Sequence, residues 1–183
     1  MAALLFLDRQ NVVPWALLAC TLHELGHLTA IYALGGRMGG LHLTVSGAEI
    51  IPERDTLFSY GEELLIIAAG PAFSLLAAAL AGWIASGGAC EALFLFAGLN
   101  LAAGVFNLLP LWPLDGGRLL QLLLIRLLDP IRGERACQLF TAMLGTGLLA
   151  LGLVLMVQTR GNPTLLLTAL WILAGVGGKG RIS

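Results

Sequence analysis

The stretch that constrains this chain most is His23-Glu24-Leu25-Gly26-His27, because it places two histidines and a carboxylate inside a long apolar run. In a helix, residues four positions apart lie on one face, so His23 and His27 can bind one metal ion side by side. Glu24 then lies beside the first ligand, where its carboxylate can take a proton from a water molecule. The stretch therefore predicts a zinc site that carries out hydrolysis.

The composition predicts that this site lies in a membrane protein. The chain has 183 residues, of which 58% are hydrophobic and only 11% are charged, and its mean hydropathy is +0.89. A soluble domain usually has about 25% charged residues. Between residues 12 and 34, the histidine and acidic side chains are those of the motif, and ionisable groups at membrane depth are usually functional. The net charge of −1 gives no electrostatic basis for binding nucleic acid.

The apolar runs predict an all-α polytopic membrane protein with about five transmembrane helices. We place the spans at about 12–34, 62–85, 91–128, 137–157 and 164–178. A kink or local unwinding is expected at Gly70-Pro71 in the second span. Between the third and fourth spans we expect a polar loop that contains Arg132, Glu134 and Arg135.

The third run is too long for one straight helix, and residues 107–117 interrupt it with two prolines and two glycines. Irregular backbone at membrane depth needs protein or a water-filled cavity around it. We therefore expect this broken helix to turn Asp115 toward the protein interior.

Residues 41–45 alternate between apolar and polar side chains, Ser46-Gly47 can form a turn, and residues 48–51 can return as a second strand. Residues 41–51 therefore predict a small β-hairpin at the membrane surface. The positive-inside rule favours a single crossing by the third run, with the N-terminus outside and the hairpin inside. With that topology, Arg9 and Arg160 face outside, and seven basic residues face inside: Arg37, Arg54, Arg126, Arg132, Arg135, Lys179 and Arg181.

A catalytic zinc ion commonly has three protein ligands and one open position. Asp115 is the acidic residue that lies deep in apolar sequence, where a bound metal ion would compensate its charge. Glu49 is the rival candidate, because it follows His27 by 22 residues, a separation at which some soluble zinc proteases place a glutamate ligand. Glu49 lies in the predicted hairpin, outside the bilayer core.

Three motifs in this chain resemble those of the site-2 proteases, which are zinc proteases that cut within the membrane. They are His23-Glu24-Leu25-Gly26-His27, Ala69-Gly70-Pro71 and the stretch from Asn107 to Gly117. The last motif is long and specific, and it is most similar to the sporulation branch of the family, whose members process a pro-sigma factor.

The resemblance implies a zinc ion held by His23, His27 and Asp115, with Glu24 as the general base. It also implies a substrate path near the metal, and a hairpin that pairs with unwound substrate as an added strand. The substrate-binding residues that we predict on this basis are Asn107, Pro113, Gly70, Pro71 and Leu43.

We expect a single membrane-embedded protease domain over residues 1–183, with a catalytic core at about 12–128 and C-terminal helices at about 137–178. Neither a PDZ nor a CBS domain is expected, and we do not expect the helix that usually precedes the catalytic one in the family. Ser74 stands where many members of the family have asparagine.

The expected function is zinc-dependent hydrolysis of a peptide bond within or next to a transmembrane segment of a membrane-tethered protein. The expected setting is a bacterial cytoplasmic membrane, with the lipid bilayer and a regulatory membrane protein as further partners. The expected substrate is a sigma-factor precursor or an anti-sigma factor. One alternative is a catalytically silent scaffold that binds substrate helices, and another is a metal transporter.

Overall fold

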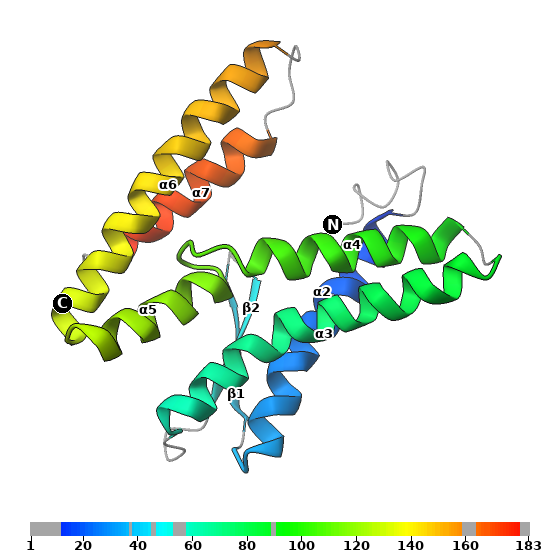
Figure 1. The fold of residues 1–183 in the computed structure, drawn as a ribbon, viewed down its shortest axis with the longest axis horizontal. Coiled ribbons are helices and arrows are strands. Elements are labelled where there is room, and N and C mark those ends of the chain that lie inside the picture. Colours follow the sequence, from blue (N-terminus) through cyan, green and yellow to red (C-terminus); the bar gives the residue numbers. More distant parts are fainter. Residues whose placement is uncertain are drawn as a thin grey trace. The chain divides into compact units, whose positions relative to one another are not determined.

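The long apolar runs form helices in the computed structural model, which describes residues 12–36, 38–44, 47–52, 58–88, 91–158 and 164–179. For residues 38–44 and 47–52 it describes the backbone alone. The chain divides into two units, one that ends at Asn107 and one that begins at Leu108 (Figure 1). Each unit carries part of the predicted site.

The first unit contains three helices, α2 (Val12–Ala33), α3 (Tyr60–Ser86) and α4 (Glu91–Asn107). A capping box begins α3: the Ser59 hydroxyl accepts from the backbone N–H of Glu62, whose carboxylate accepts from the N–H of Ser59. The helix ends in a turn at Gly88, where φ is +98°. Both α2 and α4 pack against α3, and α2 also packs against α4 (Figure 1).

The Gly70-Pro71 pair lies in the middle of α3, which stays helical from Tyr60 to Ser86. The prediction of local unwinding at this pair is therefore wrong, and the alternative of a kink stays a prediction. A proline removes one backbone hydrogen bond from a helix. Both neighbouring helices pack closely on α3 here, since a Cβ atom at Gly104 of α4 would lie 3.3 Å from the Pro71 oxygen and one at Gly26 of α2 would lie 2.7 Å from the Ala69 oxygen.

Two strands, β1 (Met38–Thr44) and β2 (Gly47–Pro52), pair in antiparallel fashion in the segment for which a hairpin is predicted. His42 is paired with Glu49, and Leu43 is paired with Ala48. The strand β2 contacts α2, the helix of the histidine motif. The position of this pair at a membrane surface stays a prediction.

The second unit contains residues 108–114 and the helices α5 (Asp115–Leu127), α6 (Pro130–Gln158) and α7 (Thr164–Lys179). Helix α6 packs against both α5 and α7 (Figure 1). The buried side chains of Leu111 and Leu114 pack with Ile172 of α7. The loop before Asp115 is therefore anchored on the core of its own unit.

The predicted break in the third apolar run is confirmed, because α4 ends at Asn107 and α5 begins at Asp115. The predicted polar loop around Arg132 is wrong, since these residues form the first turns of α6. Pro130 begins that helix, where the N–H that proline lacks is not needed. The Asp129 carboxylate accepts from the N–H of Arg132 and caps the helix.

Large apolar side chains cover much of the surface, as expected for a protein surrounded by lipid. Trp83 is 75% exposed, Leu139 is 72% exposed and Val157 is 81% exposed. Two helices of the described part are long and apolar enough to cross a membrane, Tyr60–Ser86 and Pro130–Val157, and Glu91–Asn107 is a shorter apolar helix. These features support insertion into a membrane, and the count of five crossings stays a prediction.

Candidate metal centre

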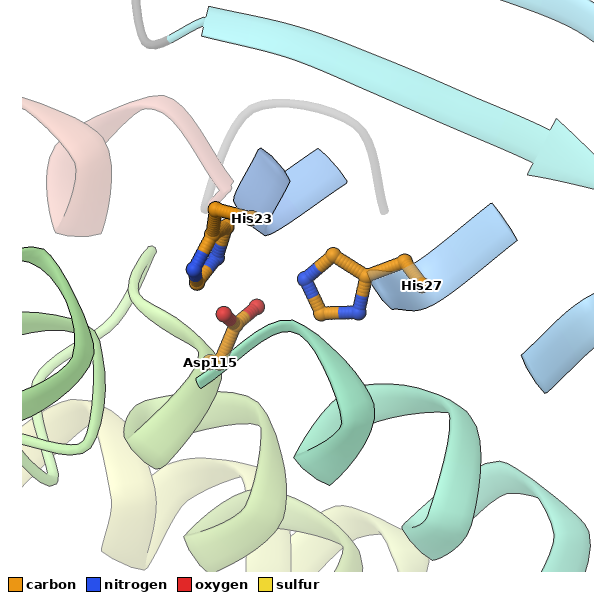
Figure 2. A group of neighbouring side chains, drawn as sticks. All are labelled: His23, His27 and Asp115. Atoms are coloured by element: carbon orange, nitrogen blue, oxygen red, sulfur yellow. The ribbon is translucent and has the colours of Figure 1, made fainter. Parts of the chain in front are cut away.

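His23 and His27 project from successive turns of α2, as the spacing of the motif predicts (Figure 2). Their ring centroids are 5.0 Å apart, and the two rings are nearly perpendicular, at 81°. His23 is only 6% exposed. One helix face therefore presents two imidazoles at the separation that a shared metal ion requires.

Helix α3 holds the Nδ1 atom of each imidazole. The Nδ1 atom of His27 lies 2.8 Å from the backbone oxygen of Ile66, and the Nδ1 atom of His23 lies 3.0 Å from the hydroxyl oxygen of Ser74. A carbonyl oxygen only accepts, so Nδ1 of His27 donates to it and Nε2 carries the lone pair that binds a metal. Metal-binding histidines are usually oriented in this way by a partner on the other ring nitrogen.

Two glycines allow α2 and α3 to approach closely enough for these hydrogen bonds. A Cβ atom at Gly26 would lie 2.7 Å from the Ala69 oxygen and 2.9 Å from the Cβ atom of Phe73. A Cβ atom at Gly70 would overlap the imidazole of His27. Gly70 and Pro71 are both buried in α3. The structure thus gives Gly70 a packing role beside a histidine, and its predicted role in substrate binding stays a prediction.

Glu24 follows His23 on α2 and is half-buried. The helix therefore carries this carboxylate beside the histidine pair, in a segment where its other neighbours in sequence are apolar. This position is compatible with the predicted role as a general base.

Asp115 is the first residue of α5 and is 8% exposed. A carboxylate in the first turn of a helix is stabilised by the partial positive charge of the helix N-terminus. Gly116 and Gly117 follow it, and a Cβ atom at either position would overlap the backbone of residues 108–112. The two glycines, which were predicted to break a helix, instead let the preceding loop fold against the first turn of α5.

The loop before Asp115 is also held by α6. The backbone N–H of Trp112 donates to the hydroxyl of Thr141, a side chain with 0% exposure, over 3.2 Å. The N–H of Leu114 donates to the Leu111 oxygen over 2.8 Å, which closes a turn. Hydrogen bonds and the packing of Leu111 and Leu114 thus define the backbone that leads to Asp115.

Figure 2 draws the three predicted metal ligands, of which His23 and His27 belong to the first unit and Asp115 belongs to the second. Two imidazole nitrogens and one carboxylate oxygen are ligands that suit zinc. The Nδ1 hydrogen bond of His27 selects the tautomer that zinc needs. The residues present therefore fit a zinc ion. For Glu49 the structure gives only the position in β2, so the choice between Asp115 and Glu49 stays a prediction.

The remaining predicted substrate-binding residues lie in three places. Asn107 ends α4, is half-buried, and donates from Nδ2 to the Ala103 oxygen over 3.0 Å. Pro113 lies in the loop before α5 and is also half-buried. Leu43 lies in β1. Their roles toward a substrate stay predictions.

Sequence reasoning missed the groups that orient the site, namely the Ser74 hydroxyl, the Ile66 carbonyl and the Thr141 hydroxyl. The sequence does contain a feature that points to Ser74, because it is a polar residue in an apolar segment, one helical turn after Gly70. No such feature points to Ile66, because the group that it contributes is its backbone oxygen.

A family model described as Peptidase family M50 matches residues 82–151, a range that contains Asn107 and Asp115. Stage IV sporulation protein FB of Bacillus subtilis (strain 168) is 34% identical over 109 residues, which are 58% of this chain and 38% of that protein. This chain therefore matches well under two thirds of that relative's length.

The fold is similar to that of the site-2 protease from Methanocaldococcus jannaschii, with a TM-score of 0.75 and 24% sequence identity. That match covers 100% of this chain and 86% of the other. The two sequence matches, together with the histidine pair on α2, agree with this likeness of fold. The chain is therefore similar in fold to a site-2 protease, and part of its sequence matches the Peptidase family M50 model.

Proposed function

We propose that this protein is an intramembrane zinc metalloprotease that hydrolyses a peptide bond within or next to a transmembrane segment of a membrane-tethered protein. The observation that carries this proposal is the pair of imidazoles on α2 whose Nδ1 atoms both have hydrogen-bond partners on α3. This arrangement turns one face of α2 into two oriented metal ligands inside an apolar segment. The match to the Peptidase family M50 model supports a proteolytic use of such a site.

The proposed zinc ligands are His23, His27 and Asp115. The buried position of Asp115 supports this choice, because an ionised carboxylate in an apolar surrounding needs a compensating charge. The glycines that follow it allow the backbone at this point to be closely folded. Glu49 remains the alternative third ligand.

When bound, zinc would supply Lewis-acid chemistry that acidifies water and polarises a peptide carbonyl. Glu24 is the proposed general base. Its carboxylate takes a proton from the attacking water and passes it to the leaving amine nitrogen, so that one group serves both halves of the hydrolysis.

The proposed substrate is an extended segment, because a helical peptide bond is shielded by its own hydrogen bonds. Such a segment could join the β1–β2 pair as an additional strand, with Leu43 among the residues that it meets. Asn107 could receive a substrate N–H on its side-chain oxygen, since its Nδ2 atom already donates to Ala103. Pro113 would shape the path beside it.

The proposed setting is multi-pass insertion into a bacterial cytoplasmic membrane, in contact with lipid. The exposed apolar side chains and the apolar helices support this setting. A sigma-factor precursor or an anti-sigma factor is the proposed kind of substrate, in line with the similarity to a sporulation protein. Regulation by a further membrane protein is part of the same proposal.

The test compares wild type with Glu24→Gln in phospholipid vesicles that also contain a pro-sigma factor with a membrane-associated pro-sequence. Loss of a general base costs about 10²- to 10⁴-fold in rate. We expect that loss for Glu24→Gln with its zinc content unchanged, and wild-type cleavage for the control Glu91→Gln, whose side chain is exposed at the start of α4.

Near wild-type cleavage by Glu24→Gln would contradict the role of Glu24. Wild-type protein that binds zinc and the pro-sigma factor, but leaves every peptide bond intact, would favour the scaffold instead.

A further inference from the structure

We propose that Ser74 is a positioning residue for the metal site, which fixes the ring orientation and the tautomer of His23. The inference rests on the proposed metal site, and it goes beyond the ligands and the base. Its direct observation is the 3.0 Å separation between the Ser74 hydroxyl oxygen and Nδ1 of His23, in a buried contact between α3 and α2.

The burial of Ser74 shows that this contact belongs to the packed interface between α2 and α3. Ser74 is 0% exposed and His23 is 6% exposed. A hydroxyl group at such a position needs a hydrogen-bond partner, because leaving a polar group unpaired in an apolar interior is costly. The His23 ring supplies that partner, so the two buried polar groups satisfy each other.

A hydroxyl group can donate or accept, so the proposed metal ion determines the direction of this bond. A metal ion bound at Nε2 of His23 needs the lone pair on that atom, so the proton lies on Nδ1. In the proposed arrangement Nδ1 of His23 therefore donates to the Ser74 oxygen. Free imidazole side chains favour the opposite tautomer, with the proton on Nε2. Ser74 thus holds His23 in the minor tautomer, which is the one that a metal ion needs at Nε2.

His27 provides an internal reference, because its Nδ1 atom donates to a backbone oxygen. Side-chain substitutions leave that carbonyl group in place. The two proposed ligands therefore differ in the kind of group that holds them. A substitution at Ser74 removes the partner of His23 and leaves the partner of His27 intact. A general disturbance of α3 would affect both rings.

The variant Ser74→Ala removes the hydroxyl with a minimal change of volume. Loss of the partner of a metal-binding histidine typically lowers metal affinity by about 10- to 100-fold. We expect a decrease in this range for Ser74→Ala, measured by competition with a chromophoric zinc chelator in detergent. Ser74→Thr keeps the hydroxyl and should retain most of the affinity, even if its extra methyl group lowers thermal stability.

The control variant is Ala78→Gly, one turn further along α3. Ala78 is 9% exposed, and the substitution removes one methyl group from the same buried region. It should lower the unfolding temperature and leave zinc affinity unchanged. This control separates a loss of packing from a loss of the histidine partner.

A second readout needs no metal. Nitrogen NMR of histidine-labelled, zinc-free protein distinguishes the two tautomers, at a pH well above the usual imidazole pKa of about 6.5. In a His42→Gln background only the two histidines of the motif remain. We expect both to carry the proton on Nδ1 in otherwise wild-type protein, and one of them to shift toward the Nε2–H tautomer in Ser74→Ala.

Unchanged tautomers in Ser74→Ala, together with zinc affinity within about twofold of wild type, would overturn the proposal. Equal shifts of both imidazoles would also overturn it, because they would show a general disturbance of α3. Wild-type protein that binds no zinc would overturn the proposed function, and the imidazole spectra alone would then decide whether Ser74 holds His23.

Discussion

The imidazole of His27 lies between the backbone of two parts of α3: its Nδ1 atom is 2.8 Å from the oxygen of Ile66, and its other side lies against Gly70. One turn of α3 thus both hydrogen-bonds the ring and leaves room for it. The Ala69-Gly70-Pro71 motif is explained in part by this contact, because a side chain at Gly70 would take the place of the ring.

Gly70→Ala should therefore weaken zinc binding by displacing His27. The added Cβ atom would overlap the imidazole, and helix backbone on both sides limits the movement that could relieve the overlap. Loss of a group that orients a metal ligand typically lowers metal affinity by about 10- to 100-fold. We expect at least a tenfold loss of zinc affinity for Gly70→Ala, measured by chelator competition.

Gly82→Ala is the matched control for this change, since its Cβ atom would meet only the Ala97 Cβ atom, at 3.9 Å. This variant lies in the same helix and adds the same methyl group. Equal zinc affinities for Gly70→Ala and Gly82→Ala would show that Gly70 is not needed for the position of His27.

Thr141→Val should destabilise the second unit, because it removes the acceptor of the Trp112 N–H. A hydrogen bond contributes about 0.5–1.5 kcal/mol to stability. The free energy of unfolding in detergent should fall by this amount. The control Thr146→Val affects an exposed hydroxyl that bonds only within its own helix, so its effect should stay within about 0.5 kcal/mol. A smaller loss for Thr141→Val than for Thr146→Val would contradict the anchoring role of Thr141.

Gly116→Ala should shift the backbone at Asp115 and leave the carboxylate group itself in place. The new Cβ atom would overlap the Leu108 carbonyl, so the loop before α5 must move away from the first turn of this helix. We expect a lower zinc content in the purified protein, measured by atomic emission. Gly147→Ala, which meets nothing within 4 Å, should keep the wild-type content. Normal zinc content in Gly116→Ala would mean that the loop tolerates this movement.

Most helix positions could be predicted from the sequence, because they depend on the lengths of apolar runs. The first predicted span, 12–34, corresponds to α2 (Val12–Ala33), and the second, 62–85, corresponds to α3 (Tyr60–Ser86). The break before Asp115 was visible for a similar reason, since a proline-rich stretch cannot continue a helix.

The errors arose where tertiary contacts or caps override local preference. Pro71 remains inside a continuous α3 because its neighbours in α2 and α4 pack around it. Arg132 lies in a helix because Asp129 caps that helix and Pro130 begins it. Polarity alone favoured a loop at this position.

The candidate ligands could be predicted from spacing and depth, whereas the groups that orient them could not. Ile66 acts through a backbone oxygen, which every residue has. Ser74 acts through a contact with a residue 51 positions away in the chain. Such pairings depend on how α2 and α3 pack, which the periodicity of either helix does not specify.

The most direct test of the proposed metalloprotease site is the zinc content per purified chain, for wild type, Asp115→Ala and Glu49→Ala. We expect about one zinc ion in wild type and in Glu49→Ala, and its loss in Asp115→Ala, as for a site with three protein ligands. Zinc that is retained in Asp115→Ala and lost in Glu49→Ala would contradict the proposed ligand set. Wild-type protein that takes up no zinc when the ion is supplied would contradict the proposed metal site.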